Sequence, residues 1–120
     1  MDDSTTIKTL KDETRKFAVE RDWEKFHNPK DLAIGVSLEV AEILELFRYK
    51  TDEEIRELLK NESFKKSLSH EMADVLNMLV RLADVCSVDL ATSFFEKLEI
   101  NKQKYPVEKV KGLSKKYDEY

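Results

Sequence analysis

The sequence predicts an all-α protein, and three observations support this. Glycine and proline occur only twice each in 120 residues, which disfavours strands joined by tight turns. Charged residues make up 38% of the chain, and apolar residues recur at three- and four-residue intervals, as they do along helices. A hydrophobic content of 41% suffices for one core, so we expect a single domain over residues 1–120 with four to five helices.

The first two helices are expected near residues 4–21 and 30–50. Ile7, Leu10 and Phe17 give the first helix its apolar stripe. Asn28-Pro29 predicts the start of the second, because Asn is a good N-cap and Pro suits the first helical position.

Three further helices are expected after residue 50. Thr51 and Glu54 have the spacing of a capping box, which indicates a short helix that ends around residue 61. A long helix is expected over 64–86, and Asp89 is the N-cap expected for a last one that stops at Tyr105-Pro106. Residues from about 106 to 120 are expected to form an irregular, extended tail.

The helix expected over 30–50 is apolar in almost every direction. A domain of 120 residues can hardly cover such a helix on all sides. We therefore expect subunit pairing to complete the bundle, as a dimer or a dimer of dimers.

Two pairs of acidic residues are spaced three apart on the expected helices: Glu39 with Glu42, and Glu71 with Asp74. This spacing puts both side chains of a pair on one helix face, with Cβ atoms about 5–6 Å apart. Such pairs are common on solvated helices, but these four residues adjoin apolar runs. Two half-buried carboxylates about 5 Å apart repel by roughly 3 kcal/mol at an effective dielectric of 20, so the pattern favours a bound cation.

The chemistry of the four acids favours Mg²⁺, with Mn²⁺ as a second possibility. Both are hard cations that prefer carboxylate oxygens. The pattern disfavours zinc, which prefers Cys and His, and it does not match a ferritin-like di-iron site, which needs Glu-x-x-His where this chain has Asp74 three residues after Glu71. Arg81, two turns after Asp74, either adds positive charge near this site or forms a salt bridge.

Two further groups of residues are candidates for substrate contacts. Lys97, Asn101 and Lys104 form one stripe of the last helix and could attract a triphosphate, although such a stripe is also an ordinary solvated face. Trp23, Phe26 and His27 precede the second helix and could either line a pocket for a base or close a corner of the bundle.

Three segments together resemble the MazG-like nucleoside triphosphate pyrophosphohydrolases, in the branch typified by dCTP pyrophosphatase. They are ERDWEKFHNPKDLAIGVSLEVAEILELF at 20–47, HEMADVLNMLVRLA at 70–83 and KLEINKQKYPVEKVKGLSKKY at 97–117. The resemblance implies a helical bundle that assembles by pairing subunits. It also implies cleavage of a (deoxy)nucleoside triphosphate to the monophosphate and pyrophosphate.

The resemblance also assigns roles to residues. Glu39, Glu42, Glu71 and Asp74 match the magnesium ligands and catalytic carboxylates, Trp23 an aromatic near the base, and Lys97 and Asn101 substrate contacts. Lys115, Lys116 and Tyr117 resemble a tail that closes over the phosphates. Tyr49 and Met78 stand where the branch usually has Trp and Tyr, both near the expected base pocket, so they put the base preference in doubt.

The expected function is therefore a Mg²⁺-dependent hydrolase for dCTP or a related dNTP. The alternatives are a dUTP- or phosphoribosyl-ATP-type pyrophosphohydrolase of the same all-α class, and a non-catalytic helical interaction module. A net charge of -4 disfavours broad nucleic-acid binding, and no apolar run is long enough to cross a membrane. The lone Cys86 suits a reducing cytoplasm.

Overall fold

The computed structural model describes residues 1–114 and 117–119 of the chain. Throughout that part the regular structure is helical, and no strand occurs in it. The predicted all-α class is confirmed. No helix within these ranges is both long and apolar enough to span a bilayer.

The chain forms two units, Met1–Ser87 and Val88–Tyr120. The first contains four α-helices and a short 3₁₀ turn: α1 (Ile7–Glu20), the turn Glu24–Phe26, α2 (Pro29–Phe47), α3 (Asp52–Leu58) and α4 (Glu62–Val85). In the described part of the second lie α5 (Leu90–Lys104), α6 (Val107–Val110) and a 3₁₀ turn, Tyr117–Glu119. The tail expected to be irregular after residue 106 thus includes a short helix, which is a correction.

Side-chain caps determine where the helices begin. The Asn28 side chain accepts a hydrogen bond from the backbone N–H of Asp31, and Pro29 opens α2, as predicted. Thr51 and Glu54 form the predicted capping box of α3. α1 starts at Ile7 rather than near residue 4, because Thr6 is its cap. α4 starts two residues earlier than expected, because Asn61 caps it.

Three helices end beside a residue with a left-handed backbone. Asp22 follows α1 with φ 54°, Tyr49 follows α2 with φ 63°, and Ser87 follows α4 with φ 55°. This conformation does not continue a right-handed helix. α2 therefore ends at Phe47 rather than at the expected Lys50.

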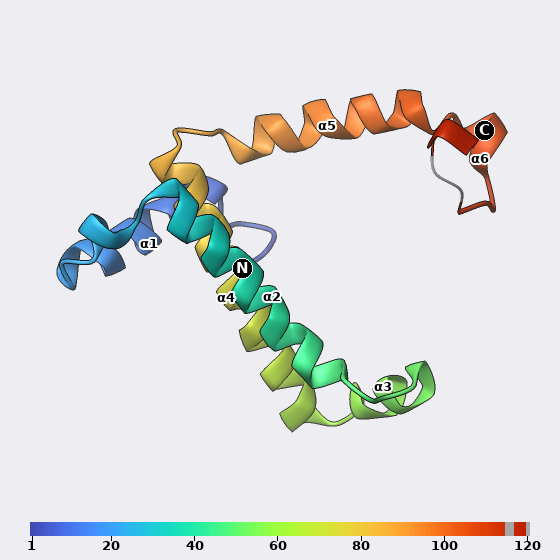
Figure 1. Ribbon diagram of the computed structural model, residues 1–120, viewed down its shortest axis with the longest axis horizontal. Coiled ribbons are helices and arrows are strands. Elements are labelled where there is room, and N and C mark those ends of the chain that lie inside the picture. The colour runs from blue at the N-terminus through green and yellow to red at the C-terminus, as the bar shows by residue number, and fades with distance from the viewer. Residues whose placement is uncertain (115–116, 120) are drawn as a thin grey trace. The chain divides into compact units, whose positions relative to one another are not determined.

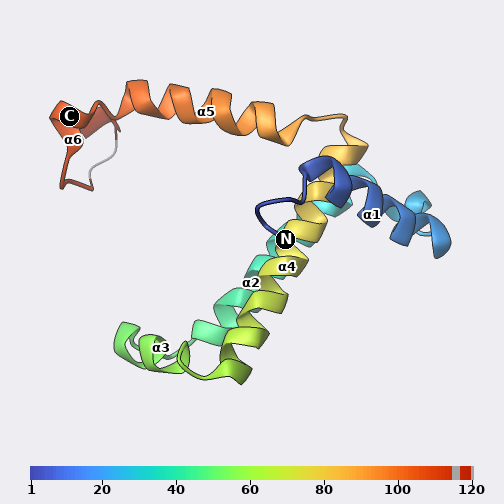
Figure 2. The same cartoon turned by 180° about the vertical axis from the view of Figure 1, so that it is seen from behind.

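The first unit is organised around the contact between α2 and α4, which lie side by side in both views (Figures 1 and 2). The two helices are antiparallel. The Met78 methyl fills the space beside Gly35 at one end, and the rings of Phe47 and Phe64 lie 6.5 Å apart at the other. α1 packs against α4 as well, and the most buried apolar side chains of the unit are Ala18, Leu32, Val80 and Ala83.

Candidate functional site

The register of α2 against α4 brings acidic residues from both helices together. Since Gly35 faces Met78, a position one turn further along α2 faces a position one turn earlier on α4. Glu39 is therefore level with Asp74. Carboxylate oxygens of Glu39, Glu71 and Asp74 all lie within 4.8 Å of one another.

Glu42 lies outside this group of three, although the sequence placed it with them. Its side chain is exposed, one helical turn beyond Glu39. Its negative charge still reaches the group, because it contributes to raising the pKa of Glu39. Glu42 is thus a neighbour of the carboxylate group rather than a member of it.

The electrostatics of the group are unfavourable for three free anions. Burial raises the pKa of Glu39, and the negative charges of Asp74, Glu71 and Glu42 raise it further. Glu39 and Glu71 are half-buried, whereas Asp74 is exposed. The single chain therefore leaves one side of the group open to solvent, whereas the sequence predicted half-buried carboxylates throughout.

The three carboxylates fit a hard divalent cation. Two oxygens on opposite sides of Mg²⁺ lie about 4.2 Å apart, twice the usual metal–oxygen distance. The separations within the group, all 4.8 Å or less, are of the same order as that span, so the three oxygens are near enough to share one ion. An all-oxygen donor set is also the set that Mg²⁺ and Mn²⁺ prefer.

A cavity of about 400 Å³ lies one turn further along α4. Asn77 lines it from α4, and Thr14, Phe17 and Arg21 line it from α1. A second hollow of about 200 Å³ between the same helices shares Thr14 and Asn77. Sequence reasoning missed this cavity, although a polar Asn77 inside the apolar run VLNMLV, three residues after Asp74, was an available signal.

Met78 and Tyr49, the two residues expected near the base pocket, have different surroundings, and their contact with a base stays a prediction. Met78 is half-buried and packs against Gly35, so it contributes to the contact between α2 and α4. Tyr49 is 89% exposed beyond the end of α2, and Arg48 donates a hydrogen bond to its hydroxyl at 2.8 Å. Glu39 lies eight residues before the end of α2, about 12 Å along the helix, and Tyr49 lies beyond that end, so the structure does not bring Tyr49 to the carboxylates of the same chain.

Trp23 and His27 belong to the connection between α1 and α2. The Trp23 ring lies edge-on to Phe17 at 5.8 Å, which places it beside the cavity. His27 Nδ1 instead accepts a hydrogen bond of 2.9 Å from Arg81 Nε. Arg81 also forms a salt bridge with Asp84 at 2.8 Å. Of the two roles predicted for Arg81, the structure therefore shows the salt bridge.

The remaining predicted residues belong to the second unit. Lys97, Asn101 and Lys104 lie on α5 with the expected spacing, and Asn101 is half-buried there. Tyr117 opens the last 3₁₀ turn, and Lys115 and Lys116 lie outside the described residues. Their contacts with substrate stay predictions.

Comparison with known proteins then assigns the family, because residues 34–120 match the MazG-like family. The chain belongs to the MazG-like family. The match covers the two acidic pairs and α5, and it confirms the resemblance drawn from the three sequence segments.

The relatives within the MazG-like family are named pyrophosphatases. Human dCTP pyrophosphatase 1 is 41% identical over 114 residues, covering 92% of this chain and 67% of the human protein. The Rattus norvegicus protein of the same name is 41% identical over 112 residues, covering 91% and 66%. The chain thus spans about two thirds of the length of these relatives.

A solved structure shares the fold. The crystal structure of a pyrophosphatase from Archaeoglobus fulgidus superposes with a TM-score of 0.74 at 40% identity. It covers 79% of this chain and 87% of the archaeal chain. The helical architecture is therefore that of an all-α pyrophosphatase.

Proposed function

We propose that the chain is a divalent-metal-dependent nucleoside triphosphate pyrophosphohydrolase that cleaves dCTP or a related dNTP to the monophosphate and pyrophosphate. The observation that carries this proposal is the convergence of Glu39, Glu71 and Asp74 between α2 and α4. Relatives at 41% identity that are named dCTP pyrophosphatase 1 support the substrate class.

The three carboxylates are the proposed ligands of Mg²⁺, or of Mn²⁺ in its place. When bound, such an ion supplies positive charge to phosphate oxygens and lowers the pKa of a coordinated water. Glu42 is suited to a different task. Because it is exposed and outside the group of three, it is free to accept the proton of the water that attacks the α-phosphorus. Attack breaks the bond between the α-phosphorus and the bridging oxygen, and pyrophosphate leaves.

The cavity beside Asn77 is the proposed place for the base. Asn77 is one turn from Asp74, so a nucleotide whose α-phosphate lies at the carboxylates can extend its base along α4 toward the cavity. Phe17 and Trp23 provide aromatic surface there. The Asn77 carboxamide offers one donor group and one acceptor, which match the edge of a base.

The second unit is proposed to contribute the phosphate contacts. Lys97, Asn101 and Lys104 on α5, with Lys115, Lys116 and Tyr117 after it, are the proposed source of positive charge and closure over the triphosphate. We expect the protein to act in the cytoplasm.

A second copy of the chain is the proposed cover for α2. Leu38 and Leu44 are each 62% exposed in the single chain, and Ile34 is 50% exposed. Apolar side chains exposed along one helix are typical of an interface. Pairing, as a dimer or a dimer of dimers, would bury them and complete the bundle.

The test is pyrophosphate release from a panel of nucleotides, with Mg²⁺, with Mn²⁺ and with chelator. We expect release from dCTP or a related dNTP only when metal is present. Preference for dUTP or phosphoribosyl-ATP would instead support those two alternatives. No release from any nucleotide, together with no thermal shift from Mg²⁺ and a non-hydrolysable dNTP, would point to a non-catalytic interaction module.

A matched variant tests the place of the base. Asn77→Ala should raise KM roughly tenfold for the best substrate, because a hydrogen bond to the base is lost. Metal dependence should be unchanged. Asn61→Ala at the start of α4 is the control for effects on helix stability alone. An unaltered KM in Asn77→Ala would show that the base does not bind beside Asn77.

A further inference from the structure

Arg81 is a buried charge that the proposed chemistry does not use. It is 6% exposed, yet it lies in a unit whose other most buried side chains are apolar. Its Nε donates to His27 Nδ1 at 2.9 Å, and its Nη1 donates to Asp84 Oδ2 at 2.8 Å. Its Nη2 lies 3.6 Å from Glu24 Oε1. One guanidinium therefore joins α4 to the segment between α1 and α2.

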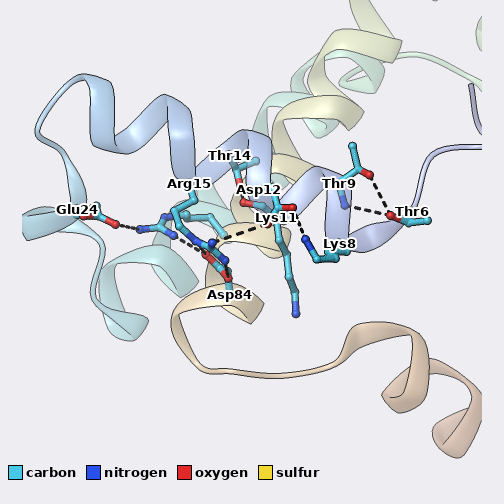
Figure 3. Close-up of polar contacts among 10 residues, drawn as sticks. Thr6, Lys8, Thr9, Lys11, Asp12, Thr14, Arg15, Glu24 and Asp84 are labelled. Carbon is cyan, nitrogen blue, oxygen red and sulfur yellow. Dashed lines mark hydrogen bonds and ion pairs between the residues drawn. The ribbon is translucent and has the colours of Figure 1, made fainter.

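Asp84 extends these contacts to α1. Arg15 Nε donates to Asp84 Oδ2 at 2.9 Å, and Arg15 Nη2 binds the other oxygen of the same carboxylate. Figure 3 shows Arg15 and Asp84 meeting across the α1–α4 contact, with Glu24 near them. The end of α1 and the start of the following segment are thus fixed to the same turn of α4.

The fixed segment supports one wall of the cavity from behind, because Trp23 packs on Phe17 and Phe17 lines the cavity. Trp23 lies between α1 and the 3₁₀ turn that carries Glu24, and its ring packs edge-on against Phe17. Phe17 lines the cavity, and the Arg21 guanidinium covers its ring at 3.7 Å. Movement of Trp23 therefore alters the packing of Phe17, and through it the shape of the cavity.

We infer that Arg81 is a positioning residue whose hydrogen bond to His27 holds Trp23 against Phe17 in the wall of the cavity, and that protonation of His27 releases this wall. The bond requires an unprotonated Nδ1, because that nitrogen is the acceptor. A protonated imidazole has only donors and a positive charge, so it would face the guanidinium without an acceptor. The hydrogen bond between Arg81 and His27 then breaks, and the segment is left with the 3.6 Å contact between Glu24 and Arg81.

The charged groups around His27 define the pH range of this change. Glu24 from the 3₁₀ turn favours the protonated imidazole, whereas Arg81 from α4 opposes it, and Asp84 and Arg15 are paired with each other. Burial, followed by the charge of Arg81, lowers the pKa of His27 below its ordinary value of 6.5. Release is therefore expected below pH 6.5, with the wall held in place at neutral pH.

The fluorescence of Trp23, the single tryptophan of the chain, reports release of the segment directly, because Trp23 lies in that segment. We would measure acrylamide quenching of its fluorescence without nucleotide, from about pH 7.5 down to about pH 5. Quenching should rise roughly twofold as His27 is protonated. Circular dichroism at each pH shows whether the helices remain folded.

Four variants make the test specific. Asn at position 27 keeps an acceptor oxygen near the place of Nδ1 but does not titrate, so His27→Asn should hold quenching low at every pH. Arg81→Lys keeps the charge but loses the planar donor pair, so quenching should be high already at neutral pH. Arg15→Gln removes the outer pair with Asp84, and a longer pair with Asp12, but leaves Arg81 and His27 in place, so it should keep the pH step. His70→Gln, at the other histidine, should behave as wild type.

The consequence for substrate rests on the proposed function. With the preferred dNTP, KM should be roughly tenfold higher in Arg81→Lys than in wild type, with kcat changed much less, and His27→Asn should reduce the rise of KM on acidification. Quenching that is flat with pH in wild type, or equal in wild type and Arg81→Lys, overturns the inference. A normal quenching step without pyrophosphate release from any nucleotide overturns the proposed function and leaves the inference standing.

Discussion

The first unit holds two clusters of charged side chains between packed helices, and they are built in opposite ways. Glu39, Glu71 and Asp74 bring like charges together with no cation among the described side chains joined to them. Around Arg81 and Asp84, opposite charges are paired at hydrogen-bond distance. The first cluster raises the pKa of Glu39, and the second lowers the pKa of Asp84. Like charges held together indicate a site for a ligand, whereas paired charges indicate a structural role.

The largest expected effect is on activity, which should depend far more on the carboxylate group than on the cluster around Arg81 and Asp84. Glu39→Gln should reduce kcat/KM for the preferred dNTP by at least about a thousandfold, because the loss of a metal ligand removes several kcal/mol of charge stabilisation. Without metal, its thermal stability should equal or exceed that of wild type, since one of the repelling charges is gone. Calorimetry and a pyrophosphate assay measure the two quantities.

Glu57→Gln is the matched control for Glu39→Gln. Glu57 is an exposed glutamate on α3 that pairs with Lys60, away from the carboxylate group. Its substitution should leave turnover unchanged. Full turnover in Glu39→Gln in the presence of Mg²⁺ would show that Glu39 is not a metal ligand.

The next effect is on stability. Asp84→Asn should lower the free energy of unfolding by about 2–4 kcal/mol, because it removes the carboxylate that pairs with both the buried Arg81 and Arg15 and leaves Arg81 only its longer contact with Glu24. Asp12→Asn is the control, since Asp12 pairs with Lys8 at the surface and its loss should cost less than about 1 kcal/mol. Urea unfolding measures both. Equal losses in the two variants would contradict a structural role for the buried pair.

A smaller effect is expected from pH through Asp84. Its hydrogen bond from Arg15, together with the charges of Arg15 and Arg81, lowers its pKa from the ordinary 3.8 against the effect of burial. Since the folded value is the lower one, the stabilisation is complete above pH 3.8 and is lost as the pH falls through the folded pKa. Urea unfolding below pH 3.8 should show a shallower loss of stability in Asp84→Asn than in wild type.

The smallest effect concerns the contact that sets the register of α2 against α4. A Cβ at position 35 would overlap the Met78 terminal methyl, which is the flexible end of a side chain. In Gly35→Ala, the gain in helix propensity of about 1 kcal/mol should nearly offset the displacement of that methyl. Gly35→Leu should instead cost about 1–3 kcal/mol through overpacking. Equal stabilities in chemical denaturation would show that α2 and α4 are not in close contact there.

The sequence determined the class and most of the elements of this protein. Helix starts at Asn28-Pro29, Thr51 and Asp89 were predictable, because a cap acts on backbone groups only two or three residues away. The two acidic pairs were predictable for the same reason, since spacing along one helix fixes which side chains share a face. The MazG-like resemblance added the order of the segments, and the family match confirmed it.

Only the tertiary structure decided which residues meet. The register of α2 against α4 selects Glu39, Glu71 and Asp74 and leaves Glu42 outside, and the packing of α1 on α4 creates the cavity at Asn77. The same packing assigns Arg81 to Asp84 and His27 rather than to the carboxylate group. These contacts join residues far apart in the chain, so they depend on how whole helices pack, which local spacing does not encode.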